Sequence, residues 1–106
     1  MSEGYNGYLN WETWLVALWI NNDEGSQDFW IEQAHEALND AQETKYFTKE
    51  DEAVFLLSDT LKDYFEDSPE IPMSSGFYYD LMMGALSVVD WKEVAETILD
   101  TAKENV

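Results

Sequence analysis

Carboxylates recur at every fourth residue along one stretch of this 106-residue chain. Asp28, Glu32, Glu36 and Asp40 have this spacing, and Glu43 follows them. Residues four apart share one face of an α-helix, so these acids would form a row whose neighbours repel by about 0.2–0.5 kcal/mol per pair. Because such a row weakens the isolated protein, we expect it to serve a cationic partner.

Two further rows of acids are expected on later helices. The first is Glu52, Asp59, Asp63 and Glu66, and the second is Glu93, Glu96, Asp100 and Glu104. The whole chain has 23 Asp and Glu against five Lys and no Arg, which gives a formal net charge of −18. The rows are therefore part of a strong charge bias.

The spacing of the rows suggests what the partner is. Acids four apart lie about 6 Å apart along a helix axis, and a nucleic-acid strand carries one phosphate per roughly 3.4 Å of rise. We therefore predict that all three rows contact a partner, and that the chain mimics phosphates in the basic groove of a DNA- or RNA-binding protein. Two alternatives remain open: the acids only keep the protein soluble, or they are an adaptation to high salt.

Composition argues against several other functions. The negative charge would repel nucleic acid and anionic lipid, and the longest apolar run, Trp14 to Ile20, is too short to cross a membrane. With no Cys and no signal-peptide pattern at the N-terminus, we expect a protein of the reducing cytoplasm of a bacterial host. Disorder is not expected, because 45% of the residues are hydrophobic.

No motif of an enzyme or a metal site occurs. The segment 21–32 departs from a calcium-binding loop at its first, fifth and sixth positions. His35 is the only histidine, and we interpret it as a surface residue in an acidic field. We therefore predict no cofactor, no metal and no catalytic residues.

The sequence predicts one all-α domain over residues 1–106, a compact bundle of about five helices after a short N-terminal turn or hairpin. The Asn6-Gly7 pair favours the turn. Helix caps are predicted at Asn10, Ser26, Thr48 and Asp90, the last two within capping boxes completed by Asp51 and Glu93. The helices would then span residues 11–21, 26–43, 48–65, 77–89 and 90–104, with an irregular, Pro- and Ser-containing connection over 67–76.

Aromatic residues are expected in two roles. The helix over 11–21 is apolar nearly all round, which places it at the centre of the domain. The residues expected in the core include Trp14, Trp19, Trp30, Trp91, Phe29, Phe55, Tyr64 and Phe65. Two groups instead form a candidate interface: Tyr5, Tyr8 and Trp11, and Phe77, Tyr78 and Tyr79. The alternative function is therefore an adaptor or structural protein that forms oligomers, a homodimer among them, through exposed aromatics.

The N-terminal segment also carries a resemblance. Its sequence YNGYLNWETW, continued by Leu18-Trp19-Ile20 and Asn22-Asp23, resembles the opening of small uncharacterised proteins from phages and other mobile elements. By charge and size the chain is similar in kind to acidic antirestriction proteins that mimic DNA, although it shares no motif with them. The resemblance implies a mobile-element origin, and together with the mimic-like charge it favours a phage-encoded anti-defence inhibitor whose partner is a restriction, CRISPR or other defence factor.

Overall fold

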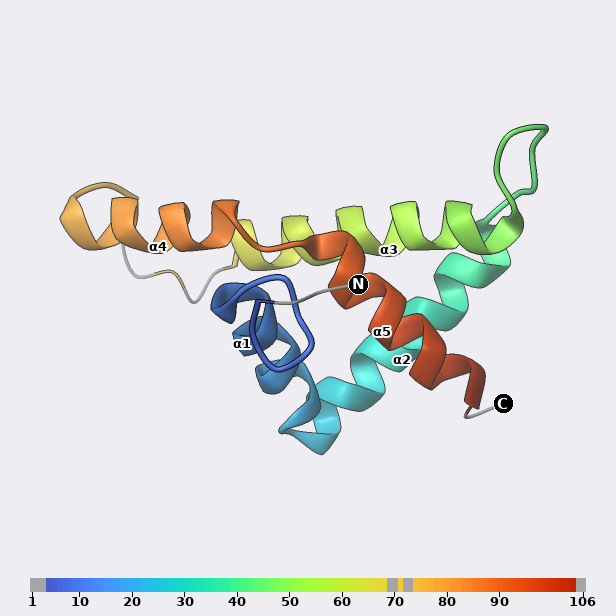
Figure 1. Ribbon diagram of the computed structural model, residues 1–106, viewed down its shortest axis with the longest axis horizontal. Coiled ribbons are helices and arrows are strands. Elements are labelled where there is room, and N and C mark those ends of the chain that lie inside the picture. Colours follow the sequence, from blue (N-terminus) through green and yellow to red (C-terminus); the bar gives the residue numbers. More distant parts are fainter. Residues whose placement is uncertain (1–3, 69–70, 72–73, 105–106) are drawn as a thin grey trace.

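The computed structural model describes residues 4–68, 71 and 74–104, and these contain five α-helices (Figure 1). They are α1 (Trp11–Asn21), α2 (Glu24–Asp40), α3 (Lys49–Glu66), α4 (Phe77–Ser87) and α5 (Trp91–Glu104). The predicted all-α bundle of about five helices is confirmed. Residues 1–3, and Pro69 and Pro72 of the predicted connection, lie outside the described residues.

The predicted N-terminal turn is present over residues 5–8. Asn6 and Gly7 have positive φ angles of 46° and 89°, which suits a two-residue hairpin turn. Tyr5 and Tyr8 exchange backbone hydrogen bonds of 2.8 and 2.7 Å across it. This turn leads the chain directly into α1.

Helices α1 and α3 begin where their caps were predicted. The side-chain oxygen of Asn10 accepts a hydrogen bond from the Thr13 backbone N–H at 2.9 Å. At the start of α3, the Thr48 hydroxyl accepts from the Asp51 N–H at 3.1 Å, and the Asp51 carboxylate accepts from the Thr48 N–H at 3.2 Å. Both caps satisfy backbone donors that a helix leaves free.

The predicted bounds of α2 are wrong by about three residues at each end. Asp23, not Ser26, is the cap, and its carboxylate accepts from the Ser26 N–H at 2.9 Å. Asp and Ser are about equally good N-cap residues, and the negative charge of Asp also interacts favourably with the positive end of the helix dipole. At the other end the Thr44 hydroxyl accepts from the Phe47 N–H at 3.1 Å in a local turn, so Glu43 lies in the loop beyond the helix.

The capping box predicted at the start of α5 is only half formed. Asp90 accepts from the Glu93 N–H at 3.1 Å, but the Glu93 carboxylate accepts from the Leu9 N–H at 2.9 Å instead. The Asp90 N–H donates to the hydroxyl of Thr13, also at 2.9 Å. Groups that would have closed a local box therefore tie α5 to the start of α1.

The core lies where α2, α3 and α5 pack together, with α5 in contact with α1 as well. Trp30, Phe65 and Trp91 stack across these three helices, with ring centroids 6.2 and 5.6 Å apart. The buried residues of α5 are Trp91, Val94, Ala95, Ile98, Leu99 and Ala102, and Trp91 was predicted to be in the core. The central helix is therefore α5.

The prediction that α1 lies at the centre is wrong. It packs at the edge of the bundle against α2 and α5, and Trp11, Leu18 and Trp19 on its outer side are exposed. Besides Trp19, five aromatics predicted as core are not fully buried: Trp14 and Phe65 are half-buried, and Phe29, Phe55 and Tyr64 are exposed. Phe29 is exposed although it is next to the buried Trp30, because adjacent residues point about 100° apart around a helix.

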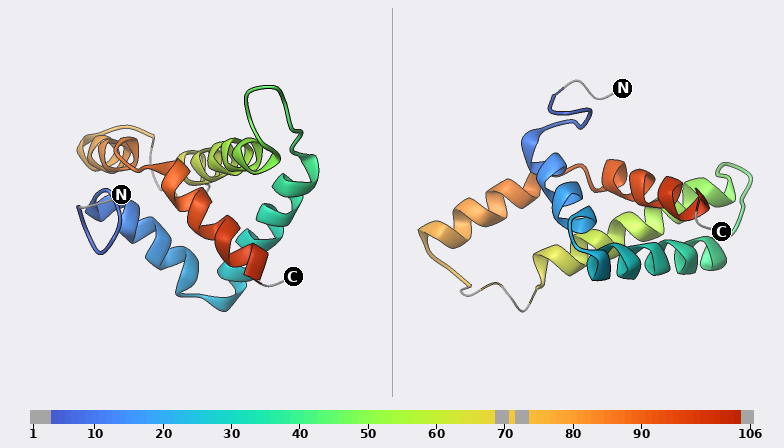
Figure 2. Two further views of the ribbon diagram at one scale, coloured as in Figure 1. Left: turned by 45° about the vertical axis from the view of Figure 1, so that its right-hand side comes forward. Right: turned by 90° about the horizontal axis from the view of Figure 1, so that it is seen from below.

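Helix α4 extends away from the rest of the molecule (Figures 1 and 2). None of its residues is fully buried. The radius of gyration is 14.5 Å, above the roughly 13 Å expected for a compact domain of this length. The helix ends at Ser87, two residues before the predicted end at Val89. There the N–H groups of Val88 and Val89 donate to the carbonyl oxygens of Ala85 and Leu86, three residues earlier, which makes a tighter turn.

Candidate partner-binding surface

The acidic row of α2 points away from the core. Trp30, Ala34 and Ala37 bury the opposite side of the helix, while the side chains of the row are all exposed: Asp28, Glu32, Glu36 and Asp40. The row covers about 18 Å and turns by about 40° per step around the helix axis. No Lys occurs in α2, so no cation within the helix interrupts this row.

The α2 row lies beside α3, and Glu43, its fifth predicted member, does not belong to it. Glu36 and Asp40 line a shallow groove of about 170 Å³ with Leu56 and Thr60 of α3. Glu43 does not continue the row because it lies past the end of α2. The row therefore consists of four acids that lie on one helix and reach the edge of α3.

The acids predicted on α3 are only partly available. Asp59 and Asp63 are exposed, whereas Glu52 and Glu66 are half-buried. Lys62 lies four residues before Glu66 on the same helix, a spacing at which opposite charges attract. This row presents less uncompensated charge than the row of α2.

The α5 row is mixed with cations and with residues that hold the fold. Glu93 is half-buried and is used in the hydrogen bond to Leu9, so it is not a free contact residue. Glu96, Asp100 and Glu104 are exposed, but Lys92 and Lys103 lie among them. Of the three rows, α5 is the weakest candidate for cation binding.

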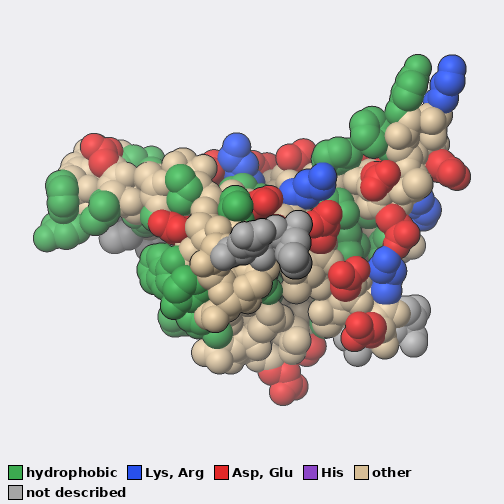
Figure 3. All heavy atoms as spheres, in the orientation of Figure 1, with side chains coloured by type: hydrophobic (Ala, Val, Ile, Leu, Met, Phe, Trp, Pro, Cys, Tyr) green, Lys and Arg blue, Asp and Glu red, His purple; other side chains and the backbone are tan. Residues whose placement is uncertain are grey.

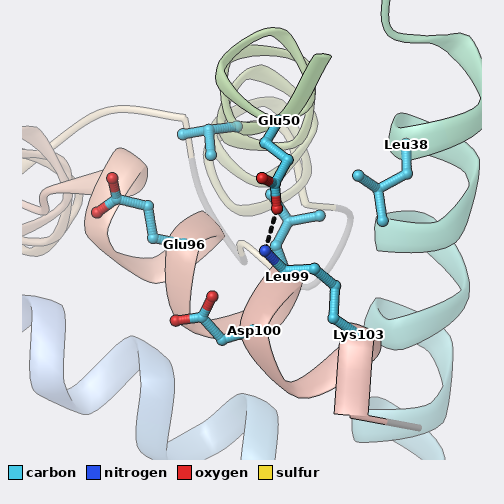
Figure 4. Close-up of a pocket in the computed structure, with 7 residues that line it drawn as sticks. Leu38, Glu50, Glu96, Leu99, Asp100 and Lys103 are labelled. Carbon is cyan, nitrogen blue, oxygen red and sulfur yellow. Dashed lines mark hydrogen bonds and ion pairs between the residues drawn. The ribbon is translucent and has the colours of Figure 1, made fainter. Parts of the chain in front are cut away.

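Figure 4 shows how Lys103 meets the acids of α5 and α3. Lys103 forms an ion pair with Glu50 beside a hollow of about 50 Å³, where Glu96 and Asp100 also lie. The hydrogen bond with Glu50 raises the pKa of Lys103, and the nearby Asp100 adds to this effect. This is the one ion pair within the described part of the chain. Glu50 belongs to none of the three predicted rows, so no acid of these rows forms an ion pair with a described residue.

The three rows do not form one surface. Because α2, α3 and α5 each turn their buried face to the shared core, their opposite faces point in different directions. In Figure 3 acidic side chains spread around α5 and α3, whereas hydrophobic side chains gather on α4 and on the side of α1. A single flat or concave partner surface therefore meets one or two rows at a time.

The two predicted aromatic groups lie apart. Asn10, next to Trp11, donates to the Val88 carbonyl at 2.7 Å, which places the first group at the C-terminal end of α4. Phe77 and Tyr78 begin α4, about 16 Å away along its axis, and they are 71% and 70% exposed. In the first group Tyr5 packs on Trp14 with centroids 5.0 Å apart, and Tyr8, like Tyr79 of the second group, is half-buried.

Sequence reasoning missed a third aromatic surface, which includes Trp19, Phe29 and Tyr64. All three were predicted to be in the core and all three are exposed. Helical periodicity offered a signal for Phe29 and Tyr64, because each directly neighbours a more buried aromatic and so points away from the core axis. Trp19 gave no such signal, because the whole of α1 is apolar.

A family model matches residues 1–104. The chain belongs to the DUF7249 family. This family is described as one of unknown function, so membership assigns no activity. No curated protein and no solved structure matches the chain.

Two kinds of feature are absent from the described part of this DUF7249 chain. No three His, Cys, Asp or Glu side chains among residues 4–68, 71 and 74–104 are placed to hold a metal ion. His35 is half-buried. No helix in the same residues is long and apolar enough to span a bilayer.

Proposed function

We propose that this protein is a non-enzymatic inhibitor that mimics nucleic-acid phosphates and occupies the basic groove of a DNA- or RNA-binding host protein. The observation that carries the proposal is the α2 row, four exposed acids without a cation in their helix. Repulsion within a row of this kind lowers the stability of the free protein, and the cations of a basic groove would offset that repulsion when the protein binds.

The geometry of the α2 row supports the same function. Its charges follow one another about 6 Å apart and wind slowly around the helix, and the phosphates of a duplex also follow a slanting path along a line of negative charge. Lys and Arg side chains that pair with phosphates are long and flexible enough to pair with such carboxylates. The α3 acids Asp59 and Asp63 extend the contact on the neighbouring helix, whereas α5 contributes least.

The biological setting that we propose is anti-defence. A phage gains from a decoy that blocks a restriction, CRISPR or other nucleic-acid-binding defence factor of the bacterial host. The resemblance of the N-terminal segment to mobile-element proteins is consistent with that role, and a decoy needs neither a cofactor nor catalytic residues.

Competition with nucleic acid tests this function. The protein is immobilised, bacterial lysate is passed over it, and bound proteins are eluted with excess duplex DNA or with a salt step. We expect DNA to release a nucleic-acid-binding protein, because both ligands would use one groove. Retained proteins that DNA cannot displace would contradict the proposal.

Charge reversal then locates the contact. Changing Glu32, Glu36 and Asp40 to Lys should abolish the interaction and flatten its dependence on salt. Changing Glu96, Asp100 and Glu104 to Lys is the matched control, since each triple variant raises the net charge from −18 to −12, two units per residue. Equal losses in the two variants would show that only the net charge matters, and no loss in the α2 variant would refute the proposal.

A second candidate function is assembly of oligomers, which the exposed face of α4 favours. Phe77, Tyr78 and Leu81 are 71%, 70% and 61% exposed, and an aromatic side chain can bury about 150–250 Å². In this function the acids maintain solubility, and copies meet through apolar surface. Leu81→Asp should then convert a dimer to a monomer in analytical ultracentrifugation, and a wild-type protein that is monomeric at all concentrations would exclude it.

A further inference from the structure

An aromatic groove lies where three helix ends meet. The C-terminal ends of α1 and α3 lie beside the N-terminal end of α2, as the right-hand view of Figure 2 shows. The groove has a volume of about 450 Å³, within the range of roughly 300–1,000 Å³ found for ligand sites. Its lining residues are Trp19, Ile20, Asp23, Ser26, Trp30, Tyr64 and Phe65.

The groove has a fixed floor and open aromatic walls. Trp30 at the floor is 2% exposed, and its ring meets Tyr64 edge-on at 5.2 Å and stacks near Phe65 at 6.2 Å. Trp19, on the α1 side, is 65% exposed and makes no ring contact with any other described aromatic. Tyr64 is 46% exposed. The indole of Trp19 is thus presented to a ligand without another ring against it, whereas Tyr64 also contacts Phe29 and Phe65, with ring centroids 6.0 and 5.2 Å apart.

The charges around the groove favour a cation. The carboxylate of Asp23 uses one oxygen, Oδ2, to cap α2, and its other oxygen has no hydrogen bond within the described residues. Helices α1 and α3 both end at the groove, and neither has a basic residue in its last turn. A helix C-terminus carries about half a negative charge, so both ends attract a cation. The opposing N-terminus of α2 already has Asp23 and Glu24 against its positive end.

We propose that this groove binds an arginine side chain of a protein partner. A guanidinium ion is planar, stacks on aromatic faces and is more weakly hydrated than an ammonium ion. Trp is the strongest aromatic partner for a cation, and the free oxygen of Asp23 can accept a guanidinium N–H. A second copy of the chain cannot supply this side chain, because the sequence contains no Arg.

The inference goes beyond the proposed phosphate mimicry and can succeed or fail without it. The α2 row begins at Asp28, close in sequence to the groove, so one basic partner could use both. Arginine is enriched among the residues that dominate binding energy at interfaces. The groove would then act as an anchor for one side chain, while the row contributes attraction along a surface.

Short peptides test the groove directly. A capped Gly-Arg-Gly peptide is titrated into the ¹⁵N-labelled protein, and the indole N–H signals of the five Trp residues are followed by NMR. We expect the signals of Trp19 and Trp30 to shift. The same peptide with citrulline, which has nearly the shape of arginine but no charge, should bind at least tenfold more weakly, and a lysine peptide should be intermediate.

Three variants assign the contacts. Trp19→Ala and Tyr64→Ala should each weaken the arginine peptide at least tenfold. Tyr46→Ala is the matched control, because Tyr46 is 79% exposed and lies on the loop at the opposite ends of α2 and α3. Asp23→Asn keeps a good helix cap and removes only the charge, so it should reduce the preference for arginine over citrulline. Circular dichroism verifies that each variant is folded.

The outcomes separate this inference from the proposed function. Equal binding of the arginine and citrulline peptides, absence of shifts at Trp19 and Trp30, or an equal loss in the Tyr46→Ala control would each overturn it. The α2 triple variant leaves every lining residue of the groove in place. If it loses its nucleic-acid-binding partner yet still binds the arginine peptide, both proposals stand; if the wild type has no such partner but binds the peptide, only phosphate mimicry fails.

Discussion

Neutralising the middle of the α2 row should make the protein more stable while weakening its binding. Glu32→Gln with Glu36→Gln removes the two central charges of the row. The substituted side chains are exposed, have similar helix propensity before and after the change, and lie outside the first and last turns of α2, where the dipole acts. Any change in stability therefore reports mainly on repulsion between neighbouring acids.

The magnitude follows from the geometry of the row. The double variant removes three like-charge pairs at the four-residue spacing, Asp28 with Glu32, Glu32 with Glu36, and Glu36 with Asp40. At about 0.2–0.5 kcal/mol per pair, the free energy of unfolding should rise by about 0.6–1.5 kcal/mol. For a domain of this size that corresponds to an increase in Tm of about 3–7 °C.

Urea unfolding at two salt concentrations is the assay. At about 0.01 M salt the Debye length is about 30 Å and the 6 Å spacing is unscreened, whereas at about 1 M it is about 3 Å and the gain should disappear. Glu96→Gln is the control, because Glu96 has Lys92 four residues before it and Asp100 four residues after it, so attraction and repulsion are lost together. No gain at low salt, or an equal gain in the control, would refute the idea that the α2 row stores repulsion.

Two further predictions concern the contacts that hold the helices in place. Thr13 is fully buried, and its hydroxyl accepts a hydrogen bond from the Asp90 N–H, so Thr13→Val should lower the free energy of unfolding by about 2–3 kcal/mol. Thr60→Val, at an exposed site, is the control and should change it by less than about 0.5 kcal/mol. Equal effects of the two substitutions in urea unfolding would contradict the role of the Thr13 hydroxyl. The pKa of Lys103 is raised above 10.5 by the hydrogen bond with Glu50, so that contact stabilises the fold fully below that pH and is lost as the pH rises through the higher folded value. The Tm difference between wild type and Lys103→Gln should accordingly be constant near neutral pH and shrink only under strongly alkaline conditions.

The sequence was sufficient where structure depends on near neighbours. The caps at Asn10 and Thr48 involve residues three apart, and both helices start as predicted. In α5 the periodicity of Val94, Ile98 and Ala102 marks a single apolar face, and that face is buried. Local chemistry of this kind needs no knowledge of the rest of the chain.

Sequence reasoning failed where two options were locally equal and a distant residue decided between them. Glu93 could close a capping box, but its carboxylate accepts a hydrogen bond from the Leu9 N–H instead. Apolar residues surround α1 on all sides, so periodicity could not show that Trp19 faces outward. The spacing of acids in the sequence shows each row on its own helix. It does not show that the rows point in different directions, because this depends on how α2, α3 and α5 pack together.

The two candidate functions require opposite responses to salt, and the structure explains why. Binding of the α2 row to a basic groove is an attraction between opposite charges and should weaken as salt rises. Self-association through α4 brings together two copies with a net charge of −18 each, so salt screens their repulsion and should strengthen the contact. Exposed apolar helices are tolerable in such a protein because this repulsion keeps copies apart at low salt. Suppose that a partner complex dissociates over the same salt range in which the free protein remains monomeric. The acids of the α2 row would then be responsible for binding, and the net negative charge of the whole protein would be responsible for its solubility.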